Sequence, residues 1–226
     1  RHSSRSMSDA ECGEEEDKRL EQDFSDLQNV EDRIKALNDE LEEKMLELDK
    51  QYTRKKRPLF EERTKICAKI PNFWLNAILN HPTLQNYVAS DDYEALRHLT
   101  VLDVQEIDEE GFSGTKYQFH FSKNEFFDNQ VLCKEFKYNT TSGDLNVDST
   151  KIKWKPGQNL ITKLKEQAKA GKRGEPEAEE SFFTWFQEDD ESEAPIGEWI
   201  REDIWKDPFK YFCGEEEGED EDAEYE

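Results

Sequence analysis

The chain has 226 residues, and 55 Asp and Glu residues against 31 Lys and Arg residues give it a formal net charge of -24. Such a charge repels nucleic acid over most of the surface and attracts basic proteins. Five Trp, seven Tyr and 14 Phe argue against a disordered acidic protein, because aromatic side chains favour a packed core.

Signals for membranes, secretion or metal binding are absent from the sequence pattern. No apolar run approaches the roughly 18 residues that a membrane-spanning helix needs. The polar N-terminus does not resemble a signal peptide. Four widely spaced cysteines predict reduced thiols in an intracellular protein rather than a zinc site: Cys12, Cys67, Cys133 and Cys213.

The N-terminal part of the chain carries an apolar stripe with helical spacing. Residues 1–19 are predicted to be disordered, and residues 1–6, before Met7, look like a cloning remnant. From residue 20, apolar side chains recur every three or four positions between charged ones, which predicts a helix over residues 20–57. The stripe comprises Leu20, Phe24, Leu27, Val30, Ile34, Leu37, Leu41, Met45, Leu48 and Tyr52.

A helix over residues 20–57 would be roughly 57 Å long, which is longer than a compact domain of this size. We therefore expect the stripe to pair with the same helix of a second copy, so that the protein is a homodimer. The pattern does not distinguish parallel from antiparallel pairing. The alternative is a long amphipathic helix that lies on its own domain.

Residues 58–213 are predicted to form one α+β domain. A second helix is expected after Pro58 and is ended by Pro71, and short helices follow over residues 72–80 and from Ser90. Alternating apolar residues then predict a four-stranded antiparallel sheet, with strands near residues 101–107, 116–122, 131–138 and 150–155.

The last third of the chain alternates between polar and aromatic segments. Residues 158–180 show no core-forming pattern and are predicted to be a mobile basic loop. The aromatic run at residues 181–186, a helix over residues 196–205 and the apolar residues of 208–212 are expected to complete the core. Residues 214–226 are predicted to be a disordered acidic tail.

Enzyme chemistry is disfavoured by the motifs. The sequence contains no nucleotide-binding loop and no hydrolase or metalloprotease signature, and its four histidines occur in unrelated contexts. A catalytic carboxylate pair needs one raised pKa in an apolar pocket, and flexible acidic runs supply no such pocket. We expect neither a cofactor nor a metal ion.

Two charged clusters are candidates for binding. The first, which we call the acidic rim, lies beside the second aromatic run, and we expect Trp185 and Trp199 to pack beneath it. It is either a docking surface for a basic partner or only a solvated face. The acidic rim comprises Glu188, Asp189, Asp190, Glu191, Glu193, Glu198, Glu202 and Asp203.

The second cluster is basic and falls within residues 158–180. Its side chains could contact the phosphates of nucleic acid, pair with the acidic tail, or only keep a loop soluble. The basic cluster comprises Lys163, Lys165, Lys169, Lys172 and Arg173.

Six segments, taken in order, resemble the nucleosome assembly protein family. They are K-I-P-N-F-W at 69–74, F-H-F-S-K-N-E-F-F at 119–127, K-E-F at 134–136, I-K-W-K at 152–155, S-F-F-T-W-F at 181–186 and D-I-W-K-D-P-F-K-Y-F at 203–212. The direct passage from Pro58 to K-I-P, without an accessory insertion, is most similar to the SET / template-activating-factor branch.

This resemblance implies a histone chaperone. The family forms a headphone-shaped dimer joined by the long helix, with an α+β earmuff at each end and an acidic underside that binds core histones, H3–H4 and/or H2A–H2B. It assists nucleosome assembly, disassembly and chromatin remodelling in the nucleus, with the cytoplasm as a second location. The SET-like branch also touches double-stranded DNA. An inhibitor of a phosphatase 2A-type enzyme and an acidic coiled-coil scaffold remain alternative functions.

Overall fold

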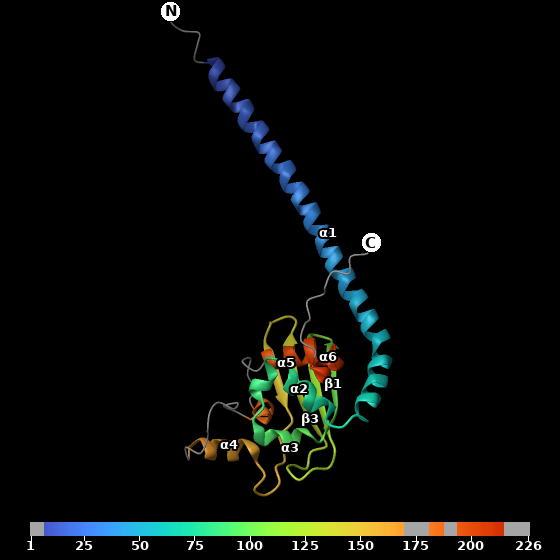
Figure 1. The fold of residues 1–226 in the computed structure, drawn as a ribbon. Helices are drawn as coiled ribbons and strands as arrows, with labels where there is room; N and C mark the ends of the chain where they lie inside the picture. The colour runs from blue at the N-terminus through green and yellow to red at the C-terminus, as the bar shows by residue number, and fades with distance from the viewer. Residues whose placement is uncertain (1–6, 170–180, 188–193, 215–226) are drawn as a thin grey trace, which may run out of the picture. The chain divides into compact units, whose positions relative to one another are not determined.

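The computed structural model describes residues 7–169, 181–187 and 194–214, with side chains described from residue 19 onward. By its internal contacts the chain divides into two units, Arg1–Glu61 and Glu62–Glu226. The first unit is helical, and the second contains the sheet and the remaining helices (Figure 1).

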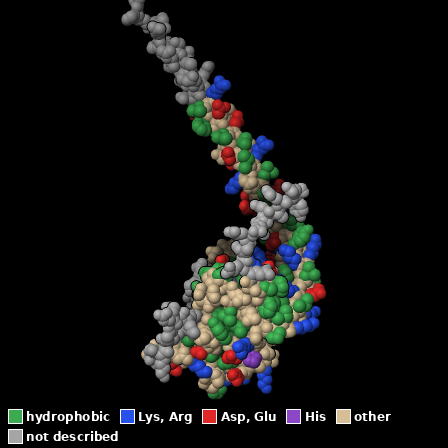
Figure 2. Space-filling view, in the orientation of Figure 1, with side chains coloured by type: hydrophobic (Ala, Val, Ile, Leu, Met, Phe, Trp, Pro, Cys, Tyr) green, Lys and Arg blue, Asp and Glu red, His purple; other side chains and the backbone are tan. Residues whose placement is uncertain are grey.

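Helix α1 spans Met7–Cys67, which is 61 residues and longer than predicted at both ends. Residues 7–19 are helical rather than disordered, so this prediction was wrong there; residues 1–6 lie outside the described part of the chain. All ten stripe side chains are exposed in the single chain, from 46% at Val30 to 65% at Leu37. Figure 2 shows hydrophobic side chains between charged ones along the coloured part of the helix.

The predicted second helix after Pro58 is the continuation of α1. Proline removes one helical hydrogen bond and costs about 3 kcal/mol in a helix interior, which is why a break was expected. The last turns of α1 are anchored in the domain instead. Arg63 donates to the carbonyl oxygens of Trp205 at 2.6 Å and Lys206 at 3.2 Å, and Cys67 is buried.

The sheet has the strand order β1-β2-β3-β4, and all three pairings are antiparallel. Its strands are Leu99–Glu109, Phe112–Phe121, Val131–Asn139 and Leu145–Ser149. Together with the long N-terminal helix and the packed helices, this confirms the predicted α+β fold class. Inward side chains alternate with half-exposed ones along the first three strands, because successive residues of a strand point to opposite faces.

The predicted fourth strand, residues 150–155, is not part of the sheet. It forms an isolated β-bridge between Trp154 and Phe127. Asn129 holds this segment by accepting from the Lys153 N–H at 2.7 Å and donating to the Lys151 carbonyl at 3.3 Å. The segment is extended and Ile152 is buried, so its alternation looked like that of a strand.

Short helices cover the inner face of the sheet. An aromatic core joins them: the ring of Phe119 lies within 6.0 Å of the rings of Phe182, Trp185 and Phe186. The short helices are α2 Phe73–Asn80, η1 Leu84–Tyr87, η2 Ser90–Asp92, α3 Tyr93–Leu96, α4 Leu160–Lys169, η3 Phe182–Phe186, α5 Ala194–Trp199, η5 Ile200–Trp205 and α6 Pro208–Cys213.

Two details of the last third differ from prediction. The expected loop at 158–180 contains α4, which buries Leu160, Ile161 and Leu164; residues 170–180 lie outside the described residues. Phe209, expected in the core, is 63% exposed. The predicted tail also lies outside the described residues beyond Gly214.

Candidate functional site

The candidate site is the surface of the α5–η5 helix, which bears the described members of the acidic rim. Ile196, Ile200 and Ile204 bury one side of this helix. At Gly197 the helix approaches the sheet closely, because a Cβ atom there would lie 3.0 Å from the Tyr117 hydroxyl. Arg201 donates to the Thr115 hydroxyl at 3.2 Å. The helix is therefore fixed to the sheet along its length.

The helix changes its winding in the middle of the site. Ile200–Trp205 is π-helical, whereas Ala194–Trp199 is α-helical. Short π-helical turns are rare and often occur at functional sites. Trp199 stands at the junction and is half-buried, not fully covered beneath the rim as expected, whereas Trp185 is buried in the aromatic core.

The three described acids of the rim have different environments. Glu198 is exposed. Glu202 forms ion pairs with Lys206 and with Arg201, at 2.8 Å from the Arg201 Nε. The hydrogen bond from Lys206 and the Arg201 charge lower the pKa of Glu202. Its charge is therefore largely matched within the helix. The other members of the rim, Glu188, Asp189, Asp190, Glu191 and Glu193, lie outside the described residues.

Asp203 is held by a buried histidine that the sequence analysis did not single out. His81 is 3% exposed, and its Nδ1 faces the backbone N–H groups of Thr83 at 3.1 Å and Leu84 at 3.0 Å. Nδ1 must therefore be the unprotonated acceptor, which leaves the proton on Nε2. Nε2 donates it to Asp203 Oδ2 at 3.1 Å. A neutral donor thus orients the Asp203 carboxylate without cancelling its charge.

A second buried carboxylate, Asp92, has a structural role. It is 0% exposed and accepts from the Ser181 hydroxyl at 2.6 Å and from the N–H groups of Phe182 and Ala89 at 2.7 and 3.1 Å. Burial raises the pKa of Asp92 and the hydrogen bonds lower it; burial is the larger effect, and the pKa is raised to about 6. Because Asp92 joins η2 to the start of η3 and is sealed from solvent, it fastens the aromatic run and offers no open catalytic position.

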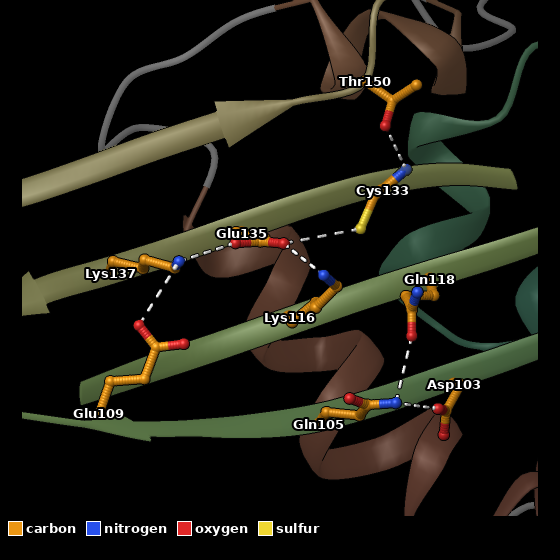
Figure 3. Close-up of polar contacts among 9 residues, drawn as sticks. All are labelled: Asp103, Gln105, Glu109, Lys116, Gln118, Cys133, Glu135, Lys137 and Thr150. Carbon is orange, nitrogen blue, oxygen red and sulfur yellow. Dashed lines mark hydrogen bonds and ion pairs between the residues drawn. The ribbon is translucent and has the colours of Figure 1, made fainter. Parts of the chain in front are cut away.

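The outer face of the sheet carries charges that are paired with one another (Figure 3). Lys116 lies 2.6 Å from Glu135, and Lys137 lies 3.2 Å from Glu135 and 3.9 Å from Glu109. Burial would raise the pKa of Glu135, but the hydrogen bonds from Lys116 and Lys137 outweigh it and lower that pKa. This face is therefore a less suitable acidic docking surface than the α5–η5 helix.

The basic cluster is partly placed by helix α4. Lys165 and Lys169 are exposed, and Lys163 donates to the Gln158 side chain at 2.8 Å. Lys172 and Arg173 lie outside the described residues. Within the described part of the chain no group of acids, histidines and cysteines could hold a metal ion, and no helix is long and apolar enough to cross a membrane.

Comparisons with known proteins agree with this architecture. A family model described as "Nucleosome assembly protein (NAP)" matches residues 67–225. The solved structure of nucleosome assembly protein S from Plasmodium falciparum superposes with a TM-score of 0.65 at 34% identity, covering 84% of this chain and 98% of that one. The chain belongs to the nucleosome assembly protein family.

Two relatives define the branch. Protein SET of Drosophila melanogaster is 34% identical over 205 residues, which cover 88% of this chain and 74% of that protein. Protein SETSIP of Homo sapiens is 37% identical over 202 residues, which cover 88% of this chain and 68% of that protein. These similarities confirm the resemblance to the SET branch. The Vps75 histone chaperone, at 19% identity and a TM-score of 0.56, shares the fold.

Proposed function

We propose that this protein is a histone chaperone that binds basic core histones through the acidic rim and assists nucleosome assembly and disassembly in the nucleus. The observation that carries this proposal is the fixed α5–η5 helix, which presents Glu198 and an oriented Asp203 on a chain with a net charge of -24. The family membership and the resemblance of the fold to histone chaperones support it.

The physical basis is electrostatic exchange. A firm acidic surface binds a basic protein with less loss of conformational entropy than a flexible acidic segment. DNA has a higher charge density than such a surface, so it can take the histones over without an energy source. The chemistry required is binding rather than catalysis.

The test compares the rim with the tail. Changing the eight rim acids to Gln and Asn should weaken binding of purified H2A–H2B and H3–H4 more than deletion of residues 215–226, at about 0.3 M salt, where long-range attraction is screened. Far-UV circular dichroism and thermal unfolding check that both variants fold equally well. An equal or larger loss on deletion would assign the binding to the tail and contradict the proposed site.

We also propose that the chaperone is a homodimer joined by the stripe of α1. All ten apolar side chains of the stripe are exposed, and a row of this length is unusual for a monomeric surface. Leu37→Glu with Leu41→Glu would place charges without partners in the pairing surface and should give monomers in analytical ultracentrifugation. Gln28→Glu with Gln51→Glu adds the same charge to exposed positions outside the stripe and is the matched control. A double Leu variant that still sediments as a dimer would exclude this interface.

A contact with double-stranded DNA is a second candidate function, favoured by the exposed Lys165 and Lys169 on the anchored helix α4. Changing the five residues of the basic cluster to Ala should weaken duplex binding and flatten its salt dependence, because fewer counterions are released. Histone affinity should change little. An unchanged DNA titration would leave this cluster with no role in DNA binding.

A further inference from the structure

The side of the α5–η5 helix that carries Asp203 also carries an aromatic pair that the fold leaves partly open. Tyr87, the last residue of η1, is 42% exposed, and its ring centroid lies 5.7 Å from that of Trp199. Trp199 precedes Asp203 by four residues, which is about one helical turn. The segment from His81 to Tyr87 thus contacts the helix twice, at Asp203 and at Trp199.

We propose that Tyr87, Trp199 and Asp203 form an arginine site, in which a guanidinium group of a basic partner stacks on the exposed Tyr87 ring and donates to Asp203. This inference rests on the proposed function and specifies which histone side chain the surface selects. Asp203 Oδ2 accepts from His81, and Oδ1 has no hydrogen-bond partner within the part of the chain that the structure describes. One oxygen of an oriented carboxylate is therefore available to a donor.

The same helix already holds a guanidinium group in this way. The guanidinium carbon of Arg63 lies 4.6 Å from the ring centroid of Trp205, while its nitrogens donate to the carbonyl oxygens of Trp205 and Lys206. A ring and carbonyl oxygens at the end of η5 thus contact an arginine side chain within the chain. The arginine site offers the same two elements on the open surface, with a carboxylate in place of carbonyl oxygens.

The combination favours arginine over lysine for a physical reason. A guanidinium group is planar and weakly hydrated, so it can lie flat on a ring while its edge donates to a carboxylate. An ammonium group is compact and strongly hydrated, and it loses more solvation when it approaches a ring. Glu202 does not compete for the incoming arginine, because Arg201 and Lys206 already pair with it.

The experiment measures arginine preference with the full-length chain. Fluorescence anisotropy gives the affinities for two labelled peptides of equal length, one of Arg and Gly and the other of Lys and Gly. Tyr87→Leu should weaken the arginine peptide about fivefold, as expected for loss of one cation–π contact, and should change the lysine peptide by less than about twofold. Asp203→Asn keeps an acceptor for His81 but loses the charge, and it should weaken both peptides while lowering the preference for arginine.

Tyr138→Leu is the matched control, because Tyr138 is 40% exposed on β3 and lies outside the arginine site. The Tyr87 and Tyr138 variants should have similar thermal stability. Equal loss of arginine binding in both variants, or equal loss of both peptides in Tyr87→Leu, overturns the arginine site. Core-histone binding of the unchanged protein is measured alongside. If the unchanged protein binds core histones but the peptide results overturn the arginine site, only the arginine site is refuted. If the unchanged protein does not bind core histones, the proposed function itself is refuted.

Discussion

Asp92 makes the stability of this fold depend on pH in a direction that one substitution can test. Its carboxylate is sealed from solvent and accepts three hydrogen bonds, from Ser181, Phe182 and Ala89. In Asp92→Asn, the amide oxygen can accept from the N–H groups of Phe182 and Ala89, while the amide nitrogen donates to the Ser181 hydroxyl. The variant therefore mimics the protonated carboxyl group with little change of shape.

The expected magnitude follows from the pKa of Asp92. Burial raises this pKa from 3.8 to about 6. A group whose pKa is raised by folding stabilises the fold fully below its unfolded pKa and loses that contribution as pH rises through the folded pKa. At about 1.36 kcal/mol per pKa unit, the free energy of unfolding should fall by about 3 kcal/mol between about pH 3, which is below the unfolded pKa, and pH 7 because of Asp92 alone.

The assay is urea unfolding of the unchanged chain and of Asp92→Asn at several pH values and one protein concentration. The difference between the two removes the titration of all other acids, and it should move by about 3 kcal/mol in favour of the variant from about pH 3 to pH 7. Asp91→Asn, at the neighbouring and less buried position, controls for loss of one negative charge. A difference that is constant with pH would show that the hydrogen bonds balance burial, and one that moves in favour of Asp92 would show that they outweigh it; either result contradicts the raised pKa.

Substitutions at two further positions, Gly114 in the sheet and His81 beside the site, test the packing. Gly114→Ala should lower the free energy of unfolding, measured by chemical denaturation, by at least about 3 kcal/mol, because the new Cβ would lie 1.9 Å from the Phe136 carbonyl oxygen. Ser113→Ala, at the neighbouring exposed position, should change it by no more than about 0.5 kcal/mol. A small loss of stability in Gly114→Ala would mean that β2 and β3 can move apart at little cost. His81→Asn keeps an acceptor for the Thr83 and Leu84 N–H groups and should lower the free energy of unfolding by about 1 kcal/mol. His81→Leu keeps no acceptor and should lower it by at least twice as much. Equal losses in the two variants would contradict the roles assigned to the ring nitrogens.

The features that were predictable from the sequence are those with a local period. Alternation placed β2 and β3 within a few residues of their observed bounds, and the spacing of three and four identified the long helix. The features that were missed have causes elsewhere in the chain. The helix continues through Pro58, and Arg63 bonds to the carbonyl groups of Trp205 and Lys206, more than 140 residues further along the chain. Residues 151–153 are held by the Asn129 side chain, and they do not form a strand of the sheet.

Helix α4 was missed for a different reason. Its buried residues Leu160, Ile161 and Leu164 occupy one side of a ten-residue segment whose other positions are mostly Lys, Gln and Thr. Three apolar residues are too few to establish a period against a polar background. The residues of α4 therefore gave no clear helical signal in the sequence.

The acidic rim shows why charge alone could not rank the candidate residues. Glu202 and Asp203 are adjacent acids in the sequence, but Glu202 is paired with Arg201 and Lys206 whereas Asp203 is oriented by a neutral histidine 122 residues away. The first acid has little charge left to offer a partner, and the second keeps its charge and gains a fixed direction. Since exposed charges far from a bound partner are screened by salt, the net charge of -24 would, under the proposed function, mainly bring basic proteins near, and we propose that oriented carboxylates such as Asp203 determine where they bind.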